Sequence, residues 1–159
     1  MILTGLPPVI DSRARVLILG SFPSAASLAA QQYYAHPQNQ FWRILGAVIA
    51  QPLKEMDYPE RLAAVLAVGI GIWDVFASCE RDGSLDSAIR NSVPNDLAAL
   101  RKSAPALRRI CFNGRMAARS IREVEALGLD AVVLPSTSPA HAGMSFEEKL
   151  ARWRDALLA

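Results

Sequence analysis

Short, mainly apolar runs alternate along this chain with longer segments that have helical spacing. The runs are 16–19, 69–75, 109–112 and 131–134, and each is followed closely by a glycine, a proline or a polar residue. Runs of this length and composition are typical of strands that are buried on both faces of a parallel sheet. The pattern therefore predicts four such strands, although two glycines in 69–75 weaken the case for the second.

Between these runs, apolar residues recur at the spacing of one helix face. The clearest case is 40–49, where Phe41, Ile44, Leu45 and Val48 fall on one side of a helix. Further helices are predicted over 59–68, 95–103, 114–126 and from Ser145 onward.

Strands that alternate with helices predict an α/β fold, here a three-layer αβα sandwich around a mainly parallel four-stranded sheet. The polar segment 77–94 is predicted to be a long surface loop. Segments rich in polar residues and glycine directly follow the strands, at 20–39, 74–78, 113–115 and 136–141. Since open α/β sheets bind ligands at the carboxyl ends of their strands, we expect the functional site there.

The composition narrows the class of protein. A chain of 159 residues with 52% hydrophobic residues fits one domain, 1–159, with a single core. The formal net charge is only +2, so binding to nucleic acid would depend on local clusters of arginine and backbone amides. We expect a monomer.

The sequence also bears on the compartment. Cys79 and Cys111 lie far apart and form no CxxC pair, which argues against a disulfide scaffold and against a zinc or iron-sulfur site. The apolar run 62–73 is shorter than the roughly 20 residues that cross a bilayer. Residues 1–10 lack the basic start of a signal peptide. We expect a cytoplasmic protein that does not bind membranes.

The segment 33–42, with the sequence YYAHPQNQFW, carries the most chemical information. Pro37 disfavours a helical conformation at His36, and Asn39 is a favourable N-cap for a helix beginning at Gln40. The two tyrosines therefore belong to a loop. Flat side chains beside an amide can hold a heteroaromatic ring by its face and its edge, which is the chemistry of a base pocket.

Together, GSFPS at 20–24, YYAHPQNQFW at 33–42 and LPSTSPAHAG at 134–143 resemble the uracil-DNA glycosylase superfamily, and its hypoxanthine-DNA (deoxyinosine) glycosylase branch in particular. The motifs occur in the order of that superfamily's catalytic loops. The resemblance implies the superfamily's fold and a DNA substrate that contains a deaminated base. It also implies base excision repair, in which the base is flipped out and its N-glycosidic bond is hydrolysed to leave an abasic site.

The resemblance gives roles to three residues. Mismatch-specific relatives carry a water-positioning Asn where this chain has Phe22, and the hypoxanthine branch relies instead on the amide that matches Asn39. Tyr34 matches an aromatic residue that stacks on the extruded base, and Phe22 is a second candidate wall. Structural roles remain open for all three, namely helix capping for Asn39 and core packing for Phe22 and Tyr34.

Two further polar residues follow strands. Asn113 could read the Watson-Crick edge of a purine, or it could only cap the helix after Gly114. Asp74 could orient a water molecule or cap a turn.

The segment 136–141 resembles the superfamily's HPSP loop, with Ser136 in place of a catalytic histidine found in other branches. Ser136 and Ser138 could grip phosphates of the DNA backbone. Ala140 stands where relatives carry a bulky wedge, so His141 or Met144 is expected to fill the space that the flipped base leaves.

No metal or other cofactor is expected, because His36 and His141 are the only histidines and no ligand cluster is evident. No lysine lies in a motif, so we expect a monofunctional hydrolase and no Schiff-base lyase. Two alternatives stay open at this point: a glycosylase for uracil or for G/U(T) mismatches, and a binding module for damaged DNA or nucleotides without catalysis.

Overall fold

A four-stranded parallel sheet forms the centre of the molecule, as seen in a computed structural model that describes residues 1–139 and 143–158. The strand order is β3-β2-β6-β7. Its members are β2 (Val16–Gly20), β3 (Ile70–Asp74), β6 (Arg109–Asn113) and β7 (Asp130–Leu134). Every neighbouring pair is parallel, and all residues of β2 and β3 are buried. The four predicted strands are thus confirmed.

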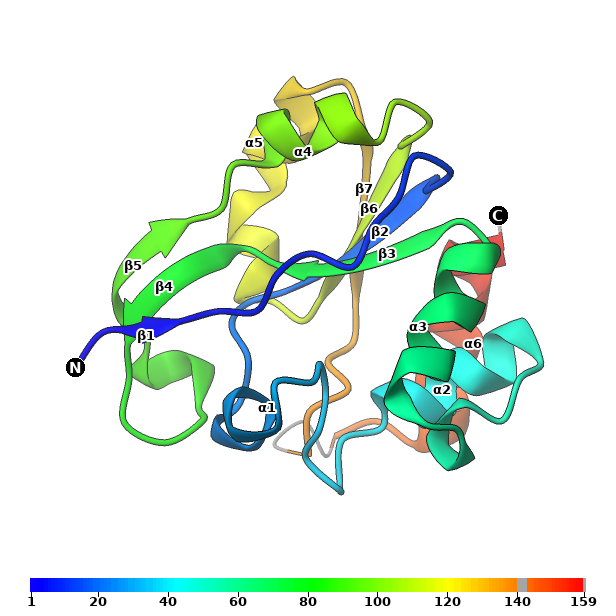
Figure 1. The fold of residues 1–159 in the computed structure, drawn as a ribbon, viewed down its shortest axis with the longest axis horizontal. Coiled ribbons are helices and arrows are strands. Elements are labelled where there is room, and N and C mark those ends of the chain that lie inside the picture. The colour runs from blue at the N-terminus through cyan, green and yellow to red at the C-terminus, as the bar shows by residue number, and fades with distance from the viewer. Residues whose placement is uncertain (140–142, 159) are drawn as a thin grey trace.

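Helices cover both faces of this sheet. Figure 1 shows one group of helices and, on the other side of the strands, a second group. The first group is α2 (Phe41–Ile49), α3 (Tyr58–Ala67) and α6 (Phe146–Leu158), and the second is α4 (Leu97–Ser103) and α5 (Ile121–Ala126). This arrangement confirms the expected three-layer sandwich. Short helical segments complete it: α1 (Ala25–Ala30) and the 3₁₀ helices η1 (Leu53–Glu55), η2 (Asp86–Ala88) and η3 (Ala117–Ser120).

The hydrophobic core includes residues from both groups of helices, among them Leu100 of α4 and Val124 of α5. Trp153 of α6, Phe41 of α2 and Phe112 of β6 are among the largest fully buried side chains. The ring of Phe41 meets that of Trp153 edge-on, with their centroids 6.0 Å apart. The predicted apolar face of α2 is buried in this core, as expected from its helical spacing. Within the described ranges, no helix combines the length and the apolar character that a membrane span needs.

The prediction of a long loop over 77–94 is wrong. This segment forms β4 (Phe76–Glu80) and β5 (Arg90–Pro94), which pair with each other and with β1 (Leu3–Thr4) in a second, antiparallel sheet of order β1-β4-β5. Every residue of β5 is exposed. Its strand conformation therefore depends on pairing with β4, and the apolar pattern gave no signal for it.

The observed helices differ from the predicted ones at two further places. The helix expected over 114–126 is divided into η3 and the shorter α5. Helix α1 was not predicted, and it begins where the Ser24 hydroxyl accepts a hydrogen bond from the backbone N–H of Ser27.

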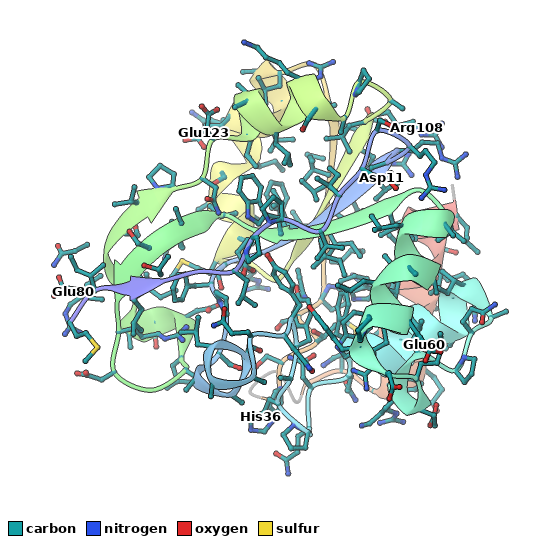
Figure 2. The ribbon with its side chains drawn as sticks, viewed as in Figure 1. Asp11, His36, Glu60, Glu80, Arg108 and Glu123 are labelled. Carbon is teal, nitrogen blue, oxygen red and sulfur yellow. The ribbon has the colours of Figure 1, made fainter. Side chains whose placement is uncertain are left out.

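The order of the strands determines where a ligand can bind. The chain passes from β2 to β3 on one side and then to β6 on the other, so the loops that follow β2 and β6 diverge and leave a crevice at their carboxyl ends. Figure 2 shows His36, in the loop before α2, at one end of the molecule. Asp11 and Arg108, which precede β2 and β6, lie toward the opposite end. The predicted motifs thus gather at the carboxyl ends of the strands.

Candidate active site

A cavity of about 190 Å³ lies at the carboxyl ends of the parallel strands. Six of the seven predicted site residues line it, while His141 and the neighbouring Ala140 lie outside the described residues. The six are Phe22, Tyr34, Asn39, Asn113, Ser136 and Ser138. The cavity is smaller than the roughly 300–1,000 Å³ of sites for drug-sized ligands, so it has room for one small ring system.

Asn39 combines capping with access to the cavity. Its Oδ1 accepts a hydrogen bond of 2.9 Å from the backbone N–H of Phe41, in the first turn of α2. The helix starts one residue later than predicted, with Gln40 at the N-cap position, yet the side chain that caps it is that of Asn39. An amide oxygen has a second lone pair and the amide nitrogen two donors, so this contact leaves Asn39 able to bind water in the cavity.

Tyr34 presents a supported aromatic ring to the cavity. The ring lies against Phe41, with centroids 3.8 Å apart and planes inclined by 15°. Its backbone has φ of +54°, a left-handed conformation that is uncommon for a residue with a bulky side chain. Burial raises the pKa of the phenol far above its ordinary value. The hydroxyl therefore stays protonated and can donate a hydrogen bond.

The neighbours of Tyr34 hold this strained loop in place. Tyr33 is buried, and its hydroxyl donates to the carbonyl of Pro7 at 2.8 Å. The indole N–H of Trp42 donates to the backbone carbonyl of Tyr33 at 3.0 Å, and Tyr58 Oη accepts from the Tyr33 N–H. Tyr33 and Trp42 thus fix the loop, and both tyrosines line the cavity.

Phe22 forms part of the cavity wall although its side chain is only 6% exposed. The guanidinium carbon of Arg81 lies 5.3 Å from the centre of its ring. This cation–π contact orients the ring from one side. Phe22 is therefore both packed against the protein and available at the cavity surface.

Asn113 joins two loops that approach from different parts of the chain. Its Nδ2 donates to Tyr34 Oη at 3.2 Å and to Thr137 Oγ1 at 3.0 Å, and its Oδ1 accepts from the Thr137 backbone N–H at 3.0 Å. Both amide hydrogens are thus directed at protein groups. The contacts link the tyrosine loop to the 136–138 loop, a connection that neither the base-reading nor the helix-capping interpretation anticipated.

The 136–138 loop is well anchored at its centre. Thr137 is fully buried, and its carbonyl accepts from the Gln40 N–H at 3.0 Å. The Ser136 hydroxyl accepts from the Ser138 N–H at 3.1 Å. Gly114 has φ of +94°, and a Cβ there would lie 3.3 Å from the Cβ of Ser136, so the close approach of the two loops favours glycine.

The outer wall of the cavity comes from the segment that joins β4 and β5, which sequence reasoning missed. Ser84, Leu85 and Asp86 line the cavity. The Ser21 hydroxyl donates to Asp86 Oδ1 at 2.6 Å, and the Arg81 guanidinium donates to the Pro23 carbonyl at 2.6 Å. These bonds attach the segment to the GSFPS loop. The only sequence signal was a cluster of turn residues at 80–84, which indicates a turn but not its partner.

Asp74 places a buried carboxyl group in the cavity. It ends β3, opposite Gly20 of β2, and its side chain is 5% exposed. Its Oδ2 is buried and has no hydrogen-bond partner in the described part of the chain. Burial and, to a smaller extent, the nearby charge of Asp86 raise the pKa of Asp74 to about 7, against the opposing effect of Arg81.

Groups that would support other chemistry are not gathered here. Across residues 1–139 and 143–158, no three side chains of the His, Cys, Asp and Glu types are grouped as a metal site. Lys149 is 1% exposed, and its ammonium donates to the Gln40 side-chain oxygen at 3.1 Å, behind the motif loop. Burial lowers its pKa. It is not among the residues that line the cavity.

The structure thus joins an α/β sandwich with aromatic and amide side chains at the carboxyl ends of its parallel strands. The chain belongs to the uracil DNA glycosylase superfamily, whose family model matches residues 7–158.

Relatives within that superfamily are similar over nearly the whole chain. A protein of Methanosarcina acetivorans named hypoxanthine DNA glycosylase is 43% identical over 145 residues, which are 91% of this chain and 92% of the relative. A protein of the same name from Methanosarcina barkeri is 38% identical over 152 residues, which are 96% of each. The solution NMR structure of a candidate uracil DNA glycosylase from M. acetivorans has a TM-score of 0.87 and 41% identity, with full coverage of both chains.

Proposed function

We propose that this protein is a DNA glycosylase that removes hypoxanthine from DNA by hydrolysing its N-glycosidic bond, leaving an abasic site. The observation that carries the proposal is the cavity, where six predicted site residues from four segments of the chain line a space large enough for one small ring system. Two relatives at 38% and 43% identity carry the name hypoxanthine DNA glycosylase, which supports this choice of base.

In this proposal the damaged base leaves the helix and enters the cavity. Tyr34, supported from behind by Phe41, stacks on the base, and Phe22 forms a second wall. Enzymes that act on a base inside a duplex must extrude it, which costs a few kcal/mol. Stacking on an aromatic side chain returns about 1–3 kcal/mol for each base.

Asn39 is then the residue that positions the attacking water. The sugar passes through an oxocarbenium-like state, which does not require a covalent nucleophile. Because Phe41 already holds Asn39 Oδ1 by a backbone hydrogen bond, the amide is fixed before the substrate arrives. Fixed dipoles of this kind stabilise developing charge without reorganisation during the reaction.

A hydrolase without lyase activity is the form of the enzyme that the lysines favour. A Schiff base needs an accessible, unprotonated amine. Lys149 is buried and bonded to Gln40 outside the cavity lining, and no other lysine lines the cavity within the described residues. We therefore propose a monofunctional enzyme.

Contacts to the DNA backbone are assigned to the loop that carries Ser136 and Ser138. Hydroxyl and backbone amide groups can bind phosphates without reading the sequence. We propose His141 as the residue that fills the vacated stack, on the motif match alone. With a net charge of +2, DNA binding is expected to be local. We also propose that the protein binds DNA as a monomer.

Uracil is the second candidate base, because a solved structure at 41% identity is described as a candidate uracil DNA glycosylase. Uracil and hypoxanthine both carry a ring N–H beside a carbonyl, so one pocket edge could serve either. A pure binding module for damaged DNA is the non-enzymatic alternative.

The test is a panel of labelled oligonucleotides that contain hypoxanthine, uracil, xanthine or thymine opposite each normal base. After incubation with the protein, alkali cleaves any abasic site, and untreated samples report lyase activity. We expect scission at hypoxanthine that depends on alkali. Scission at uracil alone would select the second candidate, and binding without scission on every substrate would select the binding module.

A further inference from the structure

Asp74 is the one acidic side chain that is both buried and part of the cavity lining in the described part of the chain. It lies at the end of β3, directly beside Gly20 of β2, and its side chain lines the cavity. One oxygen of its carboxyl group is left for a ligand to bind, since Oδ2 has no hydrogen-bond partner within the described residues. A buried polar atom without a hydrogen-bond partner costs folding free energy, unless a bound ligand supplies the partner.

The charges around Asp74 favour its neutral form. Asp86, on the outer wall, is a second acid that acts on it as a like charge. Arg81 is the opposing cation, but its guanidinium donates to the carbonyls of Pro23 and Gly83. The phenols of Tyr33 and Tyr34 also face Asp74 and remain neutral. No described side chain therefore supplies Asp74 Oδ2 with a donor that an ionised oxygen would need.

We propose that Asp74 acts as a neutral carboxylic acid that pairs with the O=C–N–H edge of the extruded base. A protonated carboxyl has one O–H donor and a carbonyl acceptor side by side. The carbonyl oxygen accepts from the ring N–H, and the O–H donates to the ring carbonyl oxygen. In hypoxanthine these groups are N1–H and O6. The inference rests on the proposed glycosylase function and assigns a specificity-determining residue to its site.

The protonation state decides whether this pair can form. An ionised carboxylate has only acceptors, so one oxygen would oppose the ring carbonyl. An acid that is kept neutral near pH 7 by an apolar site, so that it can donate a hydrogen bond, is a known catalytic device. The pKa of about 7 places the change within the range where excision can be measured.

The experiment compares single-turnover excision of hypoxanthine by the wild-type protein, Asp74→Asn and Asp74→Leu between pH 5.5 and 9. The wild-type rate is expected to fall above about pH 7, by about tenfold for each pH unit once the acid is ionised. Asparagine presents a donor and an acceptor at every pH, so Asp74→Asn should keep activity and lose this fall. Asp74→Leu presents neither and should lose at least about tenfold at every pH.

Two further arms separate base contact from a structural role. Asp86→Asn removes the like charge, so the fall should move to lower pH. With an oligonucleotide that contains unsubstituted purine, only the N1 acceptor remains, because this base has no carbonyl and no N1–H. The difference between wild type and Asp74→Leu should therefore be smaller than on hypoxanthine.

Each outcome decides one question. If Asp74→Asn is as inactive as Asp74→Leu, or keeps the wild-type pH profile, the assignment of Asp74 is overturned. It is equally overturned if Asp74→Leu is impaired on unsubstituted purine as much as on hypoxanthine. If the wild-type protein excises no base from any oligonucleotide, the proposed function itself fails.

Discussion

Gly20 and Asp74 are direct partners at the ends of β2 and β3, and a Cβ atom on Gly20 would lie 2.5 Å from Asp74 Oδ1. The same atom would lie 3.0 Å from Tyr34 Oη. The glycine of the GSFPS motif is therefore required by close approach of side chains from two other segments. Its φ is not in the left-handed region, so backbone conformation is not the reason.

Gly20→Ala is expected to displace the Asp74 carboxyl and the Tyr34 ring, because the added methyl group meets both. Overpacking of this kind typically costs about 1–3 kcal/mol of stability. We expect a folded protein with strongly reduced excision, measured by circular dichroism and single-turnover assays. Gly5→Ala is the matched control, since its Cβ would meet only ordinary contacts of 3.4 Å. Equal activity in the two variants would contradict the argument.

Asn39→Ala should reduce excision by about 10²-fold or more, the typical cost of removing a fixed catalytic dipole. The same change removes a helix cap and should lower the free energy of unfolding by about 1 kcal/mol. Asn39→Ser separates the two effects, because a serine hydroxyl can cap α2 but lacks the amide. We expect Asn39→Ser to be stable and still impaired. Gln38→Ala, at an exposed neighbour in the motif, should leave excision unchanged.

Asp74 makes stability depend on pH with a defined sign. Its pKa is about 7 in the folded protein, against about 3.9 for an aspartate in an unfolded chain. Between these values the folded state holds a proton that the unfolded state has released, so the stabilisation is complete below pH 4 and is lost as pH rises through 7. Asp74→Asn removes this dependence.

Chemical denaturation at pH 4, 5.5, 7 and 8 measures this effect. Between pH 4 and pH 8, the free energy of unfolding of the wild-type protein should fall relative to that of Asp74→Asn by on the order of a few kcal/mol. Parallel curves for the two proteins would show that Asp74 titrates normally in the fold.

Substitutions at Asn113 and Thr137 should lower the free energy of unfolding by different amounts. Asn113→Ala removes three hydrogen bonds that join the tyrosine loop to the 136–138 loop. At about 1 kcal/mol for each bond, we expect a loss of about 3 kcal/mol in unfolding free energy and weaker substrate binding. Thr137→Val removes only the Oγ1 acceptor and keeps the backbone contact, so its loss should be smaller. An equal loss in both variants would assign the effect to the buried threonine site.

Excision should survive EDTA, and borohydride should trap no covalent complex with DNA. The first expectation follows from the lack of a grouped ligand set in the described ranges, and the second from the buried, bonded state of Lys149. An activity assay after dialysis against EDTA tests the first expectation. A gel-shift assay after borohydride treatment tests the second. A trapped adduct would establish a lyase mechanism.

The strands β2 and β3 could be predicted from sequence because all their residues are buried, which makes them continuous apolar runs. The strand β7 was predicted from a similar run, although it is only partly buried. The helix α2 and its apolar face were equally visible in the spacing of Phe41, Ile44, Leu45 and Val48. The strand β5 was not, since all five of its residues are exposed and it is held by pairing with β4. Pairing between segments leaves no local pattern in composition.

The candidate site also combines residues that could be identified from the sequence with residues that could not. The motifs brought Tyr34, Asn39 and Phe22 to attention through their residue types, and all three line the cavity. Asp86 could not be found, because its relation to Ser21 depends on how the β4–β5 segment folds back over the GSFPS loop. The two-loop connection made by Asn113 is likewise a tertiary contact with no signal in the chain.

The segment between β4 and β5 forms one wall of the cavity, yet polar bonds such as those from Ser21 and Arg81 attach it to the GSFPS loop. Such a segment can detach at a lower free energy than β2 and β3, whose residues are all buried. In native-state hydrogen exchange, amides of β5 should therefore exchange through local opening while those of β2 exchange only on global unfolding. A substitution that removes the hydrogen bond from Arg81 to the Pro23 carbonyl would then increase the fraction of molecules with an open site. It would not change the stability of the parallel sheet.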